Sequence, residues 1–156
     1  MIEGSIRTGF LAALVLCAAG ALGQSAVSNS YDANLANAVT ANNCSSGEPV
    51  ALSGTVHVSY SVSTDSSGAN NFAIAAATNL SGIGQNTGAA YTAGDSDDYS
   101  SSTTDASADL TVELKSALTA QNGGPGLNLV QSLHIVVDTS GNISVQVVSN
   151  TTNCGS

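Results

Sequence analysis

Two histidines are the residues of this chain whose type and surroundings most resemble a chemical site. His57 and His134 each lie between two aliphatic residues, so in an extended segment both side chains are predicted to point away from the core. If the two strands are neighbours, the imidazoles could meet on one face, and Glu48 could complete a metal site of borderline-soft ligands. The simpler interpretation is that each imidazole hydrogen-bonds a nearby group or faces solvent.

A run of aspartates supplies a second set of candidate ligands. Asp95, Asp97 and Asp98, followed by Asp105, carry the hard oxygen atoms that calcium prefers. The spacing of an EF-hand loop, with its central glycine and final glutamate, is absent. A calcium site is one hypothesis for this segment, and a charged, solvated loop is the simpler one.

The remaining polar residues form no catalytic or nucleotide-binding motif. Gly82, Gly84 and Gly88 lack the spacing and the following helix of a dinucleotide fingerprint, and are instead predicted to permit positive φ or a bulge. The serines include no Gly-x-Ser-x-Gly elbow, and nothing links a histidine and an aspartate to a particular serine. The sequence therefore indicates no cofactor and gives no support to an enzyme.

The first 23 residues have the features of a cleavable signal peptide. A short polar start with Arg7 precedes an apolar run over residues 10–22, and small residues at Ala21 and Gly23 mark a cleavage site before Gln24. The run is shorter than the roughly 20 residues that a membrane-spanning helix needs. The sequence predicts a secreted protein, extracellular or periplasmic, with no permanent membrane span.

The cysteines predict one disulfide. Cys17 lies in the apolar run, but the bulky residues before it differ from a lipoprotein signal, so no lipid anchor is expected there. If Cys17 is removed with the signal peptide, Cys44 and Cys154 remain, and an even pair of cysteines in an exported protein usually forms a disulfide. Such a bond closes a long loop, which chain-entropy models associate with about 4 to 5 kcal/mol of stabilisation, and it brings both ends of the domain together.

The charge balance excludes several classes of partner. The formal charge is −9, with 11 acidic residues against 2 basic ones, and Lys115 is the base that remains after cleavage. Phosphate backbones and anionic membranes attract clustered Lys and Arg, so nucleic acid and anionic membrane surfaces are excluded as partners. No oligomerisation motif is visible.

Alternating apolar residues predict two β-hairpins. Within residues 52–62 and 72–80 the apolar positions recur with period two on either side of a turn cluster. Residues 127–137 and 143–147 repeat this arrangement around a short glycine-containing turn. These four segments carry the prediction of an all-β protein.

The segments between and before the hairpins are less regular. Residues 24–43 are predicted to be a flexible leader or a short helix, because Tyr31, Leu35 and Val39 are spaced by four. Beyond a short strand at 89–93, the Ser-, Thr- and Asp-rich tract to Asp105 is predicted to be an exposed loop.

Residues 106–120 fit a helix by composition and a strand by alternation. A strand is predicted, because Thr111 and Val112 favour the pleated surface and the neighbouring segments are strands. The resulting fold is one domain over residues 44–156, a small antiparallel meander of about six strands that forms a barrel or a sandwich closed by one disulfide.

Three parts of the chain resemble a widespread family of small secreted bacterial proteins of unknown function. The first part runs from Cys44 through Glu48-Pro49-Val50-Ala51-Leu52-Ser53-Gly54 to His57, the second is Gly82-Ile83-Gly84-Gln85-Asn86-Thr87-Gly88, and the third is the C-terminal hairpin that ends in Cys154. The resemblance implies export, a β fold and the disulfide, and it implies no chemistry.

The sequence favours a secreted, non-enzymatic β domain that acts through its surface or by binding a ligand. One alternative is a metal-binding protein or enzyme that uses His57 and His134. Another is a lipocalin-like carrier, which requires a dry internal pocket of roughly 300 Å³ or more.

Overall fold

A computed structural model describes residues 27–121 and 125–155 of the chain. The predicted signal peptide and Cys17 lie outside these residues. The described chain forms eight strands and no helix. The strands are β1 (Val27–Val39), β2 (Ala41–Asn42), β3 (Val50–Thr64), β4 (Asn70–Gly84), β5 (Ala90–Thr103), β6 (Ala108–Ala120), β7 (Leu127–Val137) and β8 (Ile143–Cys154). No helix long and apolar enough to cross a membrane occurs in this part of the chain.

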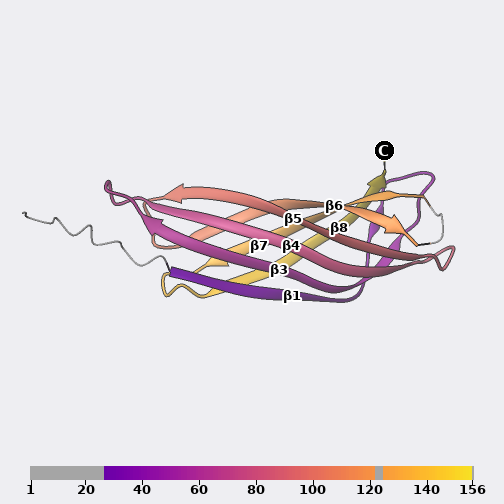
Figure 1. Ribbon diagram of the computed structural model, residues 1–156, viewed down its shortest axis with the longest axis horizontal. Coiled ribbons are helices and arrows are strands. Elements are labelled where there is room, and N and C mark those ends of the chain that lie inside the picture. Colours follow the sequence, from indigo (N-terminus) through magenta and orange to yellow (C-terminus); the bar gives the residue numbers. More distant parts are fainter. Residues whose placement is uncertain (1–26, 122–124, 156) are drawn as a thin grey trace, which may run out of the picture.

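The strands build one sheet that curls into a half-barrel (Figure 1). Their order is β1-β3-β4-β5-β6-β7-β8-β2, so the seven long strands follow one another across the sheet in sequence order, and the short β2 lies at the far edge beside β8. All pairings are antiparallel except the short parallel pair of β2 with β8. The sequence predicts about six strands. The structure has two more, β1 and β2, in the segment before the first predicted strand.

The core fills the inside of the curl. Alternate residues of each long strand point inward, as the period of two requires. In β3 the buried positions include Val56, Val58 and Tyr60, while His57 between them is exposed. Phe72 and Tyr91 are the largest of the fully buried side chains. A hollow of about 250 Å³ beside Phe72 is smaller than the roughly 300 Å³ at which ligand pockets begin, so the lipocalin-like alternative gains no support there.

One end of the half-barrel is closed. Here β5 pairs with β6 through Tyr91 and Thr92, and β2 pairs with β8. The disulfide joins Cys44 to Cys154 at this end with their Cα atoms 4.8 Å apart, as the sequence predicts. We call this the closed end, and it lies at the right of Figure 1 beside the C-terminus. A disulfide is compatible with a secreted protein.

The other end is open, because β5 and β6 part after their two paired residues. Side chains bridge this open end in place of backbone ladders. The Tyr99 hydroxyl donates to the Glu113 carbonyl at 2.7 Å, and the Tyr60 hydroxyl donates to the Gly141 carbonyl in the β7–β8 turn at 2.6 Å.

Two segments differ from their sequence predictions. Val27–Val39 is strand β1 rather than a flexible leader or short helix, because pairing with β3 supplies the backbone partners and buries Ala33 and Leu35. The predicted loop over 94–105 is strand through Thr103, because β5 pairs with β4 over its whole length. Tertiary pairing overrides weak local propensity in both segments.

The other elements confirm their predictions. The two hairpins are β3–β4 and β7–β8, and residues 106–120 contain strand β6. Gly88 has a φ of 72°, as predicted for a glycine that permits positive φ. Gly82 and Gly84 have neither the positive φ nor the bulge that the sequence predicts, and they are needed for close packing instead, since an added Cβ would lie 2.5 Å from Val50 and 2.2 Å from Glu48 respectively.

Candidate functional site

A broad trough lies on the outer face of β1, β3, β4 and β5. Its volume is about 1060 Å³, the largest of the hollows described on the molecule. The residues that line it, which define the serine trough, are Ser28, Asn29, Ser30, His57, Ser59, Tyr60, Ser61, Ala73, Ile74, Ala75, Asp98, Tyr99 and Ser100. It lies in the half of the sheet nearer the open end.

Mostly small side chains line the middle of the trough. The strand register sets Ser30 opposite Ser59, Ser59 opposite Ala75, and Ala75 opposite Asp98. The neighbouring row contains Ser28, Ser61, Ala73 and Ser100 in the same order. Because opposite Cβ atoms in such rows are about 5 Å apart, the two rows offer a regular array of hydroxyl and methyl groups.

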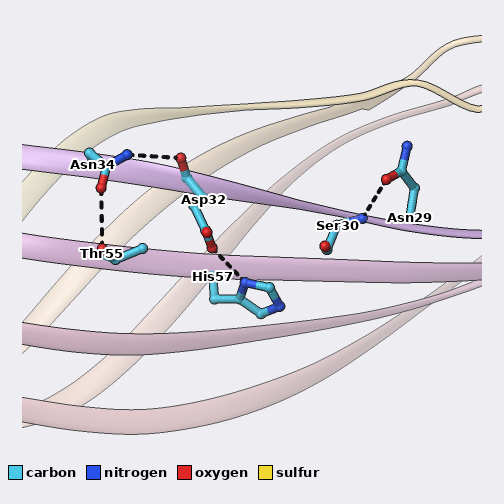
Figure 2. A network of polar contacts seen from close by, with 6 residues as sticks. All are labelled: Asn29, Ser30, Asp32, Asn34, Thr55 and His57. Carbon is cyan, nitrogen blue, oxygen red and sulfur yellow. Dashed lines mark hydrogen bonds and ion pairs between the residues drawn. The ribbon is translucent and has the colours of Figure 1, made fainter.

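His57 stands at one side of this trough and is held by a carboxylate of the neighbouring strand. Its Nδ1 lies 2.5 Å from Oδ1 of Asp32, directly opposite it in the register (Figure 2). The Asn34 side chain donates to the Asp32 carbonyl and accepts from Thr55, which extends the polar network along the β1 edge. Because a carboxylate only accepts, Nδ1 carries the proton and Nε2 is left for a ligand.

This network lacks the groups of a nucleophilic catalyst. In the described part of the chain no serine hydroxyl hydrogen-bonds either histidine. An acyl-transfer site needs a nucleophile within hydrogen-bond reach of its base. The contacts of both histidines in this part of the chain are with carboxylates.

The second histidine repeats the pairing elsewhere. Nε2 of His134 in β7 lies 2.7 Å from Oδ1 of Asp109 in β6. Three strands, β4, β5 and β6, lie between β3 and β7 in the sheet order. Each imidazole thus bonds a nearby carboxylate and points away from the core, which is the simpler of the two interpretations of the sequence.

The structure does not gather the predicted metal ligands. Glu48 is buried at the closed end, apart from both histidines. Among residues 27–121 and 125–155, no group of three or more His, Cys, Asp and Glu side chains lies close enough to hold a metal ion.

The predicted calcium ligands lie along β5 and diverge. Alternation sends Asp97 and Asp98 to opposite faces of the strand. The Asp97 carboxylate accepts from the Lys115 backbone amide at 3.3 Å, across the gap between β5 and β6, whereas Asp98 lines the serine trough. Asp95 bonds the next backbone amide, that of Ser96, at 2.8 Å.

Glu48 holds the closed end together. Its carboxylate accepts from the backbone amides of Asn86 and Thr87 at 2.8 and 2.9 Å, and from the Tyr91 hydroxyl at 3.1 Å. Burial opposes its ionisation, but the hydrogen bond from the Thr87 hydroxyl, together with the three just named, outweighs burial and holds the pKa of Glu48 below its ordinary value. Residues 44–57 and 82–88 therefore meet in one hydrogen-bond cluster.

Comparison with known proteins adds no template for the trough. No family model, curated protein or solved structure matches the chain. The assignment of a function therefore depends on the geometry of the molecule itself.

The sequence singles out His57 and Asp98 as candidates, in other roles, but not the rest of the trough. Its walls come from four strands, and one of these, β1, falls in the segment that the sequence predicts to be a leader. The alternation of Ser28, Ser30 and Asp32 with apolar or small residues is a signal that could have identified β1.

Proposed function

We propose that the chain is a secreted, non-enzymatic binding domain whose serine trough holds a neutral, hydroxyl-bearing ligand such as an oligosaccharide. The observation that carries the proposal is the trough itself, about 1060 Å³ in volume and floored by two rows of small side chains. Sites for small ligands span about 300 to 1,000 Å³, so the trough has room for an extended ligand of several units.

The chemistry of the lining supports a neutral ligand. Serine hydroxyls both donate and accept hydrogen bonds, the Asp98 carboxylate adds an acceptor, and His57 adds the ring nitrogen that Asp32 does not occupy. No Lys or Arg lines the trough, and the chain carries a formal charge of −9, so an anionic ligand is disfavoured.

Titration of the isotope-labelled mature chain with neutral oligosaccharides tests the proposal. We expect the amide resonances of Ser59, Ala75 and Asp98 to shift saturably, and equivalent anionic oligosaccharides to cause no shift. Ala75→Trp fills the trough from an exposed position and is expected to weaken binding at least tenfold.

Ser144→Trp is the matched control, because Ser144 is exposed on β8 and does not line the trough. Equal loss of binding in both variants, or the absence of any saturable shift in the trough, would rule out this function.

A further inference from the structure

The half-barrel has a slit between β1 and β8. β1 pairs with β3 alone, and β8, beyond its pairing with β7, meets β2 at just two residues, Thr151 and Thr152. A hollow of about 360 Å³, which we call the β1–β8 slit, is lined by Tyr31, Ala33 and Leu35 of β1 and by Val145, Val147 and Asn150 of β8, among others.

Exposed apolar side chains concentrate on the two strands that flank this slit, and one of them, Tyr31, lines it. Of the five exposed large hydrophobic residues in the described chain, four lie on β1 and β8, namely Val27, Tyr31, Val39 and Val148. Tyr31 is 40% exposed although it shares the inward phase of β1 with the buried Ala33 and Leu35. Its exposure therefore arises from the missing neighbour on the β8 side.

Strand direction decides what fits between β1 and β8. Each successive pairing from β1 to β8 is antiparallel, and their number makes β1 and β8 run in the same direction, as the parallel pair of β2 with β8 also shows. A single strand inserted between them can run antiparallel to both. The gap between β5 and β6 cannot be filled this way, because those two strands are antiparallel and Tyr99 already spans them.

The lining also restricts the chemistry of an inserted strand. None of the residues that line the slit is charged, although the chain carries a formal charge of −9. β8 contains no charged residue, and the one on β1, Asp32, turns to His57. Edge strands that avoid pairing usually present lysine or proline, and neither occurs in β1 or β8.

We propose that the β1–β8 slit binds an extended, uncharged peptide segment of a partner protein, which adds a strand antiparallel to both β1 and β8. Backbone ladders on two sides supply the affinity, and alternate apolar side chains of the segment cover Tyr31 and Val147. The slit widens to admit the segment. No ladder between β1 and β8 has to break, and the side-chain contact that gives way is the exposed hydrogen bond from the Asn29 amide to the Gly141 carbonyl in the β7–β8 turn, 3.3 Å long. The proposal concerns strand edges and is independent of the serine trough.

A peptide with the sequence of residues 54–62 is the probe, because this part of β3 is the natural antiparallel partner of β1. We expect it to bind the intact mature chain saturably in a fluorescence anisotropy titration, and a scrambled peptide of the same composition not to bind. Hydrogen exchange should slow at least tenfold for amides of β1 and β8 when the peptide is bound, with no change in β5 and β6.

Charge placed in the slit provides the matched test. Ala36→Lys/Gln146→Lys changes two exposed lining residues and is expected to weaken peptide binding at least tenfold, while Ala106→Lys/Gln85→Lys adds the same charge at exposed sites elsewhere and should leave binding unchanged. Absence of saturable binding, or protection of β5 and β6 instead, would overturn the proposal. A peptide-free chain that sediments as a dimer with protected β1 amides would also overturn it, since a second copy would then fill the slit.

Discussion

The two ends of the half-barrel are connected by different means. At the closed end two backbone pairs, β5–β6 and β2–β8, and one covalent bond, the disulfide, make the connection. At the open end side chains make it, through Tyr60 and Tyr99. A backbone ladder holds two strands at a fixed spacing, whereas a side-chain bridge leaves their edges apart.

The two candidate binding surfaces lie where backbone connections between strands are few. The serine trough lies in the half of the sheet nearer the open end, and the β1–β8 slit runs where no ladder joins the two strands. Regions with fewer backbone connections open at lower free energy. The closed end therefore acts as the anchor, and the surfaces available for binding lie beyond it.

Loss of the disulfide should have the largest effect on this anchor. The bond spans a sequence separation of 110 residues, and the double variant Cys44→Ser/Cys154→Ser is expected to lose about 4 kcal/mol of unfolding free energy, because the unfolded chain regains its freedom. Denaturation by urea measures the loss. A change below about 1 kcal/mol would show that the backbone pairs alone hold the closed end.

Gly84→Ala should have the next largest effect. The added Cβ would lie 2.2 Å from Oε1 of Glu48, and that carboxylate is fixed by its hydrogen bonds and cannot move aside. We expect a loss of about 1 to 3 kcal/mol in urea denaturation, as for overpacked cores. Gly126→Ala is the control, because its Cβ would meet no atom within 4 Å. Equal stability of the two variants would contradict this account of the closed end.

Acid should weaken the closed end through Glu48. Because the pKa of Glu48 in the folded chain lies below its ordinary value of 4.5, its contribution to stability is complete above that pH and is lost as the pH falls below it. Glu48→Gln removes this contribution, so the stability of the variant should fall less steeply below pH 4.5. Urea denaturation at a series of acidic pH values measures the slope.

An open-end carboxylate supplies the comparison for Glu48. Hydrogen bonds from Asn142 and Ser140 also lower the pKa of Asp138, which is exposed in the β7–β8 turn. Asp138→Asn should flatten the acid slope less than Glu48→Gln does, because solvent screens an exposed carboxylate. The reverse order would place the main acid-sensitive contact at the open end.

The sequence predicts the parts of the fold in which each strand carries its own signal. β3, β7 and β8 alternate apolar and polar residues clearly, and turn residues such as Gly141 separate the hairpin strands. β1 and the second half of β5 do not alternate clearly, because Ser, Asn and Asp dominate their sequences. Pairing with β3 and β4 makes these segments strands. Composition favours a loop in such segments until pairing with β3 or β4 is known.

The candidate sites are less predictable, because each combines residues far apart in the sequence. His57 is visible as a candidate, but its partner Asp32 lies 25 residues away in a segment whose strand signal is weak. The trough and the slit depend on strand order and on which edges stay unpaired. Neither property is encoded in the period of a single strand.

At the open end, loss of the Tyr60 bridge should have a smaller effect than any change at the closed end. Tyr60→Phe keeps the buried ring and removes the hydrogen bond to the Gly141 carbonyl, which is expected to cost about 1 kcal/mol in urea denaturation. Faster hydrogen exchange in the β7–β8 turn should accompany the loss. Slower exchange there, or a loss as large as that of Gly84→Ala, would show that the two ends are equally rigid.

Alkali should produce the smallest effect, through Tyr99. Burial, with the nearby Asp97 charge, raises the pKa of Tyr99 to about 12, above its ordinary value of 10.0. The folded chain therefore holds this proton more tightly than the unfolded chain, so the contribution is complete below pH 10 and is lost as the pH rises toward 12. Tyr99→Phe should be slightly less stable at neutral pH and should lose less stability than the parent chain at about pH 11.

Tyr91→Phe provides the comparison at the closed end for this alkaline test, since burial and the bond to Glu48 also raise the pKa of Tyr91. If the open end yields first, hydrogen exchange at about pH 11 should accelerate in β6 before it does around Tyr91. Removal of Tyr99 should abolish that order, because the bridge that ionisation breaks is then already absent. Exchange that accelerates first around Tyr91 would mean that alkali acts through the Glu48 cluster, and the closed end would then be the weaker of the two at high pH.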